Sequence, residues 1–367
     1  MSTFYRINSK SLTEICSDIL RKAGVPDKDA DIVAESLVDA DLRGVSSHGV
    51  IRMSIYLQRM GRGVIAKNAE VKIVHETDST VVLDGGYGIG QVVSQRAVEL
   101  LIKKAENSNL SAVSVRHSNH FGAAAYWASQ VLEKDMIGFV VSNVEPLMPP
   151  PGGAAAKVGN NPIAMAIPSD KEKPIIVDMA TSVVPLGKIL AAKSKGQAIP
   201  EGWAVDHMGQ PTTNPDDVVQ GGFLFPVGGP KGYGLAILVD ILSALLSNGA
   251  VGTDIHSMYR DFDNPNDISH FFMAIRVDAF MDPKLFKASV DRYIQYMKNT
   301  PLAPGAAAIY LPGEIEANNK ETNLTEGIIL PQTVAQELQS FAEEAGLDPA
   351  LIAELTGNPL HPEKANV

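Results

Sequence analysis

The chain has 367 residues, 45% hydrophobic and 20% charged, and its formal net charge is -11 from 31 Lys and Arg against 42 Asp and Glu. This composition is that of a globular protein with room for two domains or one large one, and the acidic balance argues against nucleic acid or an anionic membrane as a partner. The single cysteine, Cys16, excludes a disulfide within the chain, so we expect a reducing, cytoplasmic compartment.

The N-terminal sequence MSTFYRINSKSL has no apolar core of the kind found in signal peptides. No segment reaches the roughly 18 uninterrupted apolar residues that a membrane span needs. The most apolar stretch, residues 235–246, contains Asp240 and is expected to form a buried helix.

The first part of the chain, residues 10–63, is expected to be helical. The apolar periodicity predicts three helices, at 11–23, 27–42 and 50–60. The polar segment RGVSSHG, at 43–49, separates the second helix from the third.

From Val71 the hydrophobic period changes to two, which indicates strands. VKIVHE and STVVLDG are expected to pair. The elements expected next are a helix at 91–106, a strand at 111–118, a helix at 121–134 and a strand at 137–143. This alternation is typical of an α/β region.

A loop rich in Pro and Gly, residues 145–162, interrupts the alternation, and an irregular segment of that length usually has a function. Beyond it we expect strands at 163–167 and 174–178, a helix to about 195, a turn-rich stretch at 196–231, a helix from Tyr233, a strand at 270–280, a helix at 283–299, a strand at 306–314 and a helical tail at 331–356.

The stretch VVLDGGYGIGQ, at 81–91, has the strand–glycine–helix order of a dinucleotide-binding crossover. That fingerprint requires G-x-G-x-x-G and an acidic residue at the end of the next strand. Gly86 and Gly88 fit, but Gln91 occupies the third glycine position and the next strand ends in Arg-His-Ser-Asn. We favour a structural turn; a cofactor loop or a loop beside another kind of site are the alternatives.

The segment RGVSSHGVIR presents Ser47, His48 and Arg52 between two helices. Arg52 follows His48 by four residues, so both side chains can share one helical face. An imidazole beside a guanidinium suits a hydroxy or keto acid, because Arg binds a carboxylate and His exchanges a proton near pH 7. A helix cap with a surface Arg is the other interpretation, and both stay open.

The segment VRHSNHFG places His117 and His120 at the end of a predicted strand, where α/β proteins bind ligands. Their H-x-x-H spacing is compatible with zinc, and a zinc hydrolase is the alternative from a different class. No third ligand or cysteine pair accompanies them, so we expect no metal site. Strand spacing predicts that one imidazole lies in the site and the other outside it. We regard the remaining histidines as structural or exposed: His75, His207, His256, His270 and His361.

Three later turns carry charged residues. Asp178 ends a predicted strand and either caps the next helix or lies where backbone amides hold a phosphate. Lys231 opens a helix, where its charge opposes the helix dipole, so an anionic partner is expected. YLPGE, at 310–314, is the third turn.

Taken together, these segments resemble the malate/L-lactate dehydrogenase family of type 2. The matching blocks run in order over residues 10 to about 330: RGVSSHGVIR, SNHFGAAAYWA, PGGAAAKVGNNPIA, DMATS, GPKGYGL and YLPGE. The family includes ureidoglycolate and sulfolactate dehydrogenases, 2,3-diketo-L-gulonate reductase and a cyclic-imine carboxylate reductase, which are the alternatives within it.

The resemblance implies NAD(P)-dependent interconversion of a 2-hydroxy acid and its 2-keto acid. Malate or L-lactate is the favoured substrate and NAD the favoured cofactor, with NADP as the alternative. It also implies an α/β fold whose non-Rossmann cofactor domain, at 71–314, has a mixed sheet. A mainly helical domain would combine 1–70 with about 315–367, in a homodimer with its sites near the subunit contact.

The resemblance also assigns site residues. Ser47 and Arg52 would bind substrate, and either His48 or His120 would be the acid/base. His117 and the triple proline at 149–151 depart from the family pattern. The residues expected to contact the dinucleotide are Val144, Asp178, Met179, Ala180, Lys231, Pro312, Gly313 and Glu314.

Overall fold

The computed structural model describes residues 4–194 and 196–360, so His361 lies outside the described residues. The helices are α1 (Ser9–Lys22), α2 (Asp27–Leu42), α3 (Met53–Gly61), α4 (Gly90–Ser108), α5 (Ala124–Ser129), α6 (Leu186–Ser194), α7 (Pro215–Val219), α8 (Pro230–Ser243), α9 (Pro283–Lys298), α10 (Glu314–Glu326), α11 (Gln332–Glu344) and α12 (Pro349–Ala353). The strands are β1 (Phe4–Ile7), β2 (Lys72–Glu76), β3 (Thr80–Asp84), β4 (Leu110–Ser118), β5 (Met136–Ser142), β6 (Ile163–Ile167), β7 (Ile175–Met179), β8 (Ala204–Val205), β9 (Pro211–Thr212), β10 (Phe223–Leu224), β11 (Ile268–Arg276), β12 (Ile328–Pro331) and β13 (Pro359–Leu360).

The largest sheet has seven strands in the order β2-β3-β4-β11-β5-β6-β7. β3 and β4 are parallel and every other neighbouring pair is antiparallel, so the sheet is mixed, as expected. It follows that β3, β4, β5 and β7 run in one direction. Their carboxyl ends therefore meet at one edge: Asp84, Ser118, Ser142 and Met179.

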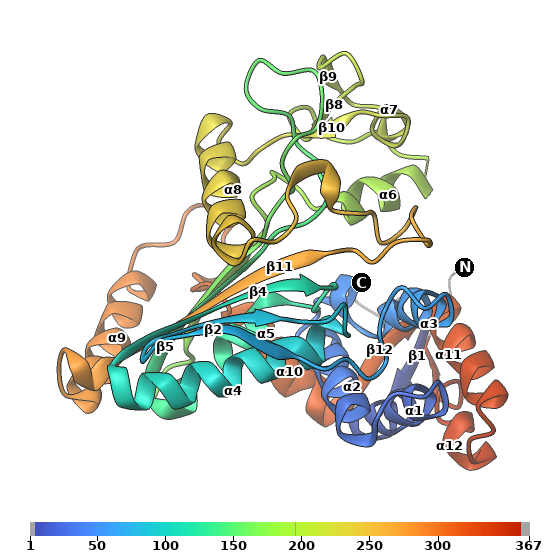
Figure 1. Ribbon diagram of the computed structural model, residues 1–367, viewed down its shortest axis with the longest axis horizontal. Helices are drawn as coiled ribbons and strands as arrows, with labels where there is room; N and C mark the ends of the chain where they lie inside the picture. The colour runs from blue at the N-terminus through green and yellow to red at the C-terminus, as the bar shows by residue number, and fades with distance from the viewer. Residues whose placement is uncertain (1–3, 195, 361–367) are drawn as a thin grey trace.

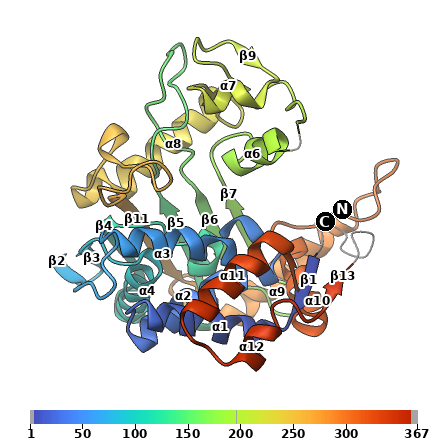
Figure 2. The same ribbon diagram turned by 90° about the vertical axis from the view of Figure 1, so that its right-hand side faces the viewer.

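Helices cover both faces of this sheet. α4 and α5 pack on one face and α8 on the other, which Figures 1 and 2 show from two sides. The core under α4 and α5 is apolar, with Trp127 and Phe272 fully buried. This packing holds the strand ends in fixed positions.

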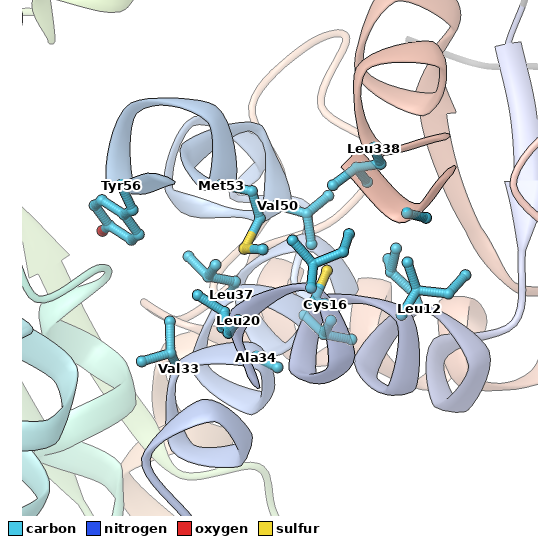
Figure 3. Close-up of a cluster of buried hydrophobic side chains, with 14 of the residues drawn as sticks. Leu12, Cys16, Leu20, Val33, Ala34, Leu37, Val50, Met53, Tyr56 and Leu338 are labelled. Carbon is cyan, nitrogen blue, oxygen red and sulfur yellow. The ribbon is translucent and has the colours of Figure 1, made fainter. Parts of the chain in front are cut away.

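A second core combines the two ends of the chain, where α1, α2 and α3 meet α11 and α12 (Figure 2). Asn8 caps α1 by accepting a hydrogen bond from the Lys10 N–H at 2.9 Å. The buried positions of α1 recur at helical spacing, so one face is apolar: Leu12, Ile15, Cys16, Ile19 and Leu20. Figure 3 shows this cluster, with Tyr56 at its margin and the Tyr56 oxygen directed away from the apolar side chains.

The strand β1, near the N-terminus, pairs with two strands from the C-terminal part of the chain. Phe4 pairs with Pro331 of β12 on one side and with Leu360 of β13 on the other. β1 was not predicted from the sequence, because its four residues are too few to show a period.

A third core lies in a lobe above the sheet in Figure 1, formed by α6, α7 and β8 to β10. Met148, Val158 and Ile189 are buried in it. The sequence analysis did not anticipate this core, because the segments around it are rich in turns and its strands have only two residues each. The long Pro- and Gly-rich loop enters this lobe through Met148 and Val158, which form an isolated bridge.

Two of the predicted elements were wrong in detail. The expected helix at 121–134 is shortened to α5 and a short turn, because Gly122 is left-handed and Ala123 is extended. No strand forms at 306–314, since only Pro312 reaches a neighbouring strand, accepting a hydrogen bond from the Ile176 N–H at 2.9 Å. Apolar composition yields a strand only where a sheet edge is available.

The helix α8 is not buried as expected. One face packs on the sheet, whereas three large apolar side chains of the helix are exposed, Leu235, Leu238 and Ile241, and so are Leu245 and Leu246 in the 3-10 turn that follows it. Residues 230–247 are long and apolar enough to cross a membrane by length and composition, with 33% of the window buried. A helix that packs in a soluble fold passes the same criterion, so this is weak evidence for a membrane span.

Candidate functional site

The glycine stretch at 85–90 packs against the backbone that carries His120. A Cβ at Gly85 would lie 2.9 Å from the carbonyl oxygen of His117, and one at Gly90 would overlap the carbonyl oxygens of Asn119 and His120. The Asn119 side-chain amide donates to the carbonyl oxygens of Tyr87 and Gly88, both at 2.9 Å. The glycines therefore allow close approach of two backbone segments.

His120 meets His48 at the carboxyl edge of the sheet. The two rings are stacked with centroids 5.6 Å apart and an interplanar angle of 23°. His48 comes from the short 3-10 turn Ser46–His48, and the Ser47 hydroxyl lies 3.0 Å from its Nδ1. The structure thus brings the adjacent residues Ser47 and His48 together with His120, which is distant from them in the sequence.

The electrostatic setting keeps both imidazoles neutral at neutral pH. Burial and the nearby Arg52 guanidinium lower the pKa of His48 to about 4. Burial lowers the pKa of His120 well below its ordinary value, and Arg52, His48 and His270 act in the same direction. Both rings remain partly accessible to solvent. A neutral, accessible imidazole is the form that can accept a proton.

Arg52 is fixed beside the two histidines. Its Nε donates to the Ser47 carbonyl oxygen at 2.6 Å, its Nη1 bonds the Tyr259 hydroxyl, and its guanidinium lies over the Tyr259 ring at 5.6 Å. Within residues 4–194 and 196–360, no carboxylate lies within 4 Å of this guanidinium. The remaining N–H groups are available to a ligand carboxylate. Tyr259 was missed because nothing in its loop sequence distinguishes it.

A buried carboxyl group anchors the loop that carries Ser47 and His48. Asp41, at the end of α2, accepts a hydrogen bond from the Val50 N–H at 2.7 Å. A Cβ at Gly49 would overlap the Asp41 carboxyl group. Burial raises the pKa of Asp41 to about 7, against the opposing effect of the hydrogen bonds from Val50 and Ser46. Asp41 was not among the predicted site residues, although an acidic residue at a buried position of an apolar helix is a signal that the sequence contains.

His117 lies outside this cluster. Its backbone is left-handed, with φ 52°, and its Nδ1 is 2.9 Å from the Asp84 carboxylate. The ring also contacts Tyr87, with centroids 5.0 Å apart. The two imidazoles of the H-x-x-H segment therefore contact different residues, and among the described residues no group of three His, Cys, Asp or Glu is placed to hold a metal ion.

The residues expected to contact a dinucleotide gather toward β7. Asp178 and Met179 are exposed at its carboxyl end, followed by Ala180. The Asp178 carboxylate accepts a hydrogen bond from the Ala125 N–H at 2.9 Å, at the start of α5. Asp178 therefore caps α5. One of its two sequence interpretations was a cap on the helix that follows it in the sequence, and the hydrogen bond to Ala125 goes to a different helix.

The turn Pro312–Glu314 packs against the same strand. A Cβ at Gly313, where φ is 85°, would lie 2.7 Å from the Ile176 Cβ. The Glu314 carboxylate accepts a hydrogen bond from the Leu311 N–H at 3.0 Å and pairs with Lys298 at 2.5 Å. Glu314 thus has structural partners of its own, beside any contact with a ligand.

Lys231 is exposed in the first turn of α8, and no carboxylate in the described part of the chain lies within 4 Å of its ammonium group. The preceding loop joins the β7 end, since the Val227 N–H donates to the Thr181 carbonyl oxygen at 2.8 Å. The Thr181 hydroxyl is buried and has no hydrogen-bond partner. An unpaired cation, a helix N-terminus and an unsatisfied hydroxyl fit the phosphates and hydroxyls of a dinucleotide.

Val144 follows β5 at the same edge. Its N–H donates to the Asn161 side-chain oxygen at 3.1 Å, and its side chain is partly buried. Since β5 and β7 run in the same direction, Val144 and Met179 lie at one edge with a single strand, β6, between them. The expected cofactor residues are therefore distributed along the part of the edge beyond β5.

Comparisons with known proteins show the family to which the chain is similar. The family model described as malate/L-lactate dehydrogenase matches residues 7–339. An L-sulfolactate dehydrogenase of Methanocaldococcus jannaschii is 42% identical, over 90% of this chain and 94% of the relative. A malate dehydrogenase of Pyrococcus horikoshii is 39% identical, over 94% of this chain and 97% of the relative.

A solved structure of malate dehydrogenase from Pyrococcus horikoshii OT3 has a TM-score of 0.86 at 37% identity and covers 94% of this chain and 97% of its own. Two relatives that are each 32% identical carry a cofactor in their names. They are ureidoglycolate dehydrogenase (NAD(+)) of Escherichia coli strain K12, over 92% of this chain and 96% of the relative, and (2R)-3-sulfolactate dehydrogenase (NADP(+)) of Chromohalobacter salexigens, over 88% and 94%.

Proposed function

The chain belongs to the malate/L-lactate dehydrogenase family, oxidoreductases that act on 2-hydroxy acids, and we propose that it interconverts malate or L-lactate with the corresponding 2-keto acid. Malate comes first because two relatives with that name, 39% and 40% identical, match over 94% of this chain, whereas the sulfolactate dehydrogenase that is 42% identical matches over 90%. The observation that carries the proposal is the stacked pair of neutral imidazoles, His48 and His120, beside the Arg52 guanidinium.

The division of labour follows from the contacts. Arg52 binds the substrate carboxylate, since its guanidinium is held in place but carries no ion-pair partner among the described residues. His120 exchanges the proton of the C2 hydroxyl group. The bound nicotinamide cofactor supplies the hydride acceptor. His48, whose Nδ1 is 3.0 Å from the Ser47 hydroxyl, orients the substrate oxygen together with Ser47.

We assign the acid/base role to His120 and not His48 because of the groups behind each ring. His48 bonds a hydroxyl on its own exposed turn, whereas His120 bonds the buried Tyr56 hydroxyl at 2.7 Å. A ring supported by buried partners keeps its orientation during proton transfer, and fixed orientation contributes to rate.

For the cofactor we propose NAD, with NADP as the alternative, since relatives carry either in their names. Lys231 would neutralise the pyrophosphate, and the exposed end of β7 at Asp178 and Met179 would contact a ribose or the nicotinamide. Pro312 and Gly313 would form the opposite wall, because they already pack on β7.

We also propose a cytoplasmic homodimer. The exposed apolar face of α8, which includes Leu238 and Ile241, is a surface that a second copy would cover. The buried Cys16 thiol is consistent with a reducing compartment. Leu238→Glu is expected to yield monomers by light scattering after gel filtration, and a monomeric wild-type protein would contradict the dimer.

The function is tested by following NADH and NADPH absorbance with a panel of oxaloacetate, pyruvate, sulfopyruvate and a cyclic-imine carboxylate. We expect preference for oxaloacetate or pyruvate, and a roughly 10²–10⁴-fold lower kcat in His120→Ala. His75→Ala is the matched control, since His75 lies exposed on β2. Wild-type rates in both His120→Ala and His48→Ala would overturn the proposed site.

A further inference from the structure

Two buried side chains, Tyr56 and Gln91, form a hydrogen-bonded chain that leads from the His120 ring into the protein. The Tyr56 hydroxyl lies 2.7 Å from His120 Nδ1, and the Gln91 side-chain amide donates to that hydroxyl at 3.1 Å. Gln91 is fully buried at the start of α4, and Tyr56 is 3% exposed. Gln91 is also the residue that replaces the third glycine of the dinucleotide fingerprint.

The direction of donation in this chain fixes the tautomer of His120. Burial raises the pKa of Tyr56 to about 12, so the phenol keeps one proton at neutral pH. Because the Tyr56 oxygen accepts from Gln91, its proton is directed at His120 Nδ1. The Gly122 N–H also approaches that nitrogen, at 3.4 Å. A neutral ring that accepts at Nδ1 carries its proton on Nε2, so it is not a base at Nε2.

The catalytic step requires the opposite direction. In hydroxy-acid oxidation His120 must begin with its proton on Nδ1, so that Nε2 can take the proton of the substrate O–H group; the O–H electron pair forms the C2 carbonyl, and the C2 hydrogen departs with its bonding pair as hydride, which the oxidised nicotinamide would accept. The ring then carries protons on both nitrogens, so Nδ1 donates to Tyr56. The Tyr56 proton then needs an acceptor on its far side.

The structure contains such an acceptor. The Gln91 side-chain carbonyl oxygen is buried and has no hydrogen-bond partner. A half turn of the carboxamide exchanges its oxygen and nitrogen within nearly the same volume. The turned amide would accept from Tyr56 where it now donates, and the Tyr56 oxygen would then accept from a proton on His120 Nδ1. The ring reaches that tautomer by exchange with water, since His120 is partly accessible: one proton leaves Nε2 for water as another is taken up from water at Nδ1.

We propose that Gln91 is a positioning residue whose two amide orientations select the protonated nitrogen of His120, and thereby switch this histidine between hydrogen-bond donor and base. The inference depends on the proposed role of His120 as acid/base. It makes Gln91 the group that alternates between donor and acceptor, since Tyr56 relays but cannot reverse the chain alone.

The test compares Gln91→Met and Gln91→Glu by kcat, KM and the pH dependence of kcat/KM. Methionine fills a similar volume without polar atoms, so kcat is expected to fall roughly tenfold or more with less change in KM. Glutamate offers only acceptors when ionised, so it favours the imidazolium and is expected to raise the acid-limb pKa of kcat/KM by about one unit.

Other polar and charged groups around His120 also affect its pKa, and they are the same in both variants. The groups that face His120 are the Arg52 guanidinium, the His48 and His270 rings, and the Tyr56 phenol. Gln95→Met is the matched control, because Gln95 lies one turn further along α4 and bonds Glu99 and Gln130. We expect wild-type kinetics from it.

A purely structural role for Gln91 would leave the pH profile of Gln91→Glu unmoved, and that result overturns the inference. If Gln91→Met does not fold, ¹⁵N shifts of the His120 ring in the wild-type enzyme decide, since substrate binding should change the protonated nitrogen. The same tautomer with and without substrate overturns the inference. An active His120→Ala variant would instead contradict the proposed function, so the two failures are distinguishable.

Discussion

The two ends of the same sheet edge are built differently. At the β3 and β4 end, His120, His48 and Arg52 are held by side-chain hydrogen bonds and close backbone packing. At the β7 end, Met179 and Lys231 are exposed. The geometry of the groups that we propose to react is thus set before any ligand binds, as rate enhancement requires. At the β7 end, the proposed dinucleotide would supply the partners that the exposed side chains lack.

The largest expected effect on activity comes from removing the Arg52 guanidinium at the β3 and β4 end of the edge. Arg52→Ala is expected to lower kcat/KM for the keto acid roughly 10³-fold, because the substrate carboxylate loses its bidentate partner. Steady-state kinetics measure this loss. Arg62→Ala is the control, since Arg62 is exposed beyond α3. An equal loss in both variants would mean that Arg52 contributes only general charge.

Packing of the loop at this end gives the next largest effect. Gly49→Ala is expected to lower the free energy of unfolding by about 3 kcal/mol, because a Cβ there overlaps the Asp41 carboxyl group. Gly61→Ala adds a Cβ with nothing within 4 Å. Urea unfolding compares the two, and similar midpoints would show that the loop yields without cost.

The pH dependence of the free energy of unfolding tests the role of Asp41 beneath the same loop. The folded-state pKa of Asp41, about 7, lies above its ordinary value of 3.8, so the folded chain keeps a proton that the unfolded chain has released. Stability is therefore lost as pH rises through this window, by roughly 2 kcal/mol between pH 5 and 7. Asp41→Asn keeps an acceptor for the Val50 N–H and is expected to flatten the dependence. Urea midpoints at both pH values decide, and parallel slopes in the two proteins would refute the assignment.

Substitutions at the β7 end of the sheet edge are expected to have the smallest effect on kinetics. Lys231→Ala should raise KM for the reduced cofactor about tenfold with little change in kcat, because one exposed charge contact to phosphate is lost. Lys284→Ala is a close control, since Lys284 also follows a proline in the first turn of a helix, α9. A fall in kcat without a change in KM would place Lys231 in the chemistry instead.

The strongly periodic elements were predictable from the sequence. The helix expected at 27–42 is α2, and the strand expected at 111–118 is β4 less its first residue. Local periodicity suffices there, because one face of each element is buried. Of the site, Ser47, His48, Arg52 and His120 were found through their residue types and through family resemblance, and the structure shows that they meet.

The hydrogen bonds that link Tyr56 and Gln91 to the His120 ring could not be predicted from the sequence. Tyr56 bonds His120 across 64 positions and Gln91 across 35 from Tyr56, and no local pattern marks either contact. Gln91 was noted only as a defect in a glycine fingerprint. Such residues act through tertiary contacts, which a single sequence does not encode in any period or spacing.

Because β1 pairs with β12, this part of the fold forms only after the ribosome has synthesised both segments. Arg6 and its partner Glu326 are 320 residues apart, and the core beneath the Ser47 and His48 turn includes Leu330 and Leu338. At 5–20 residues per second, a ribosome needs roughly 16–64 s to deliver the second half of that core. Until residues 326–338 have been synthesised, the turn that carries Ser47 and His48 lacks part of the apolar core beneath it.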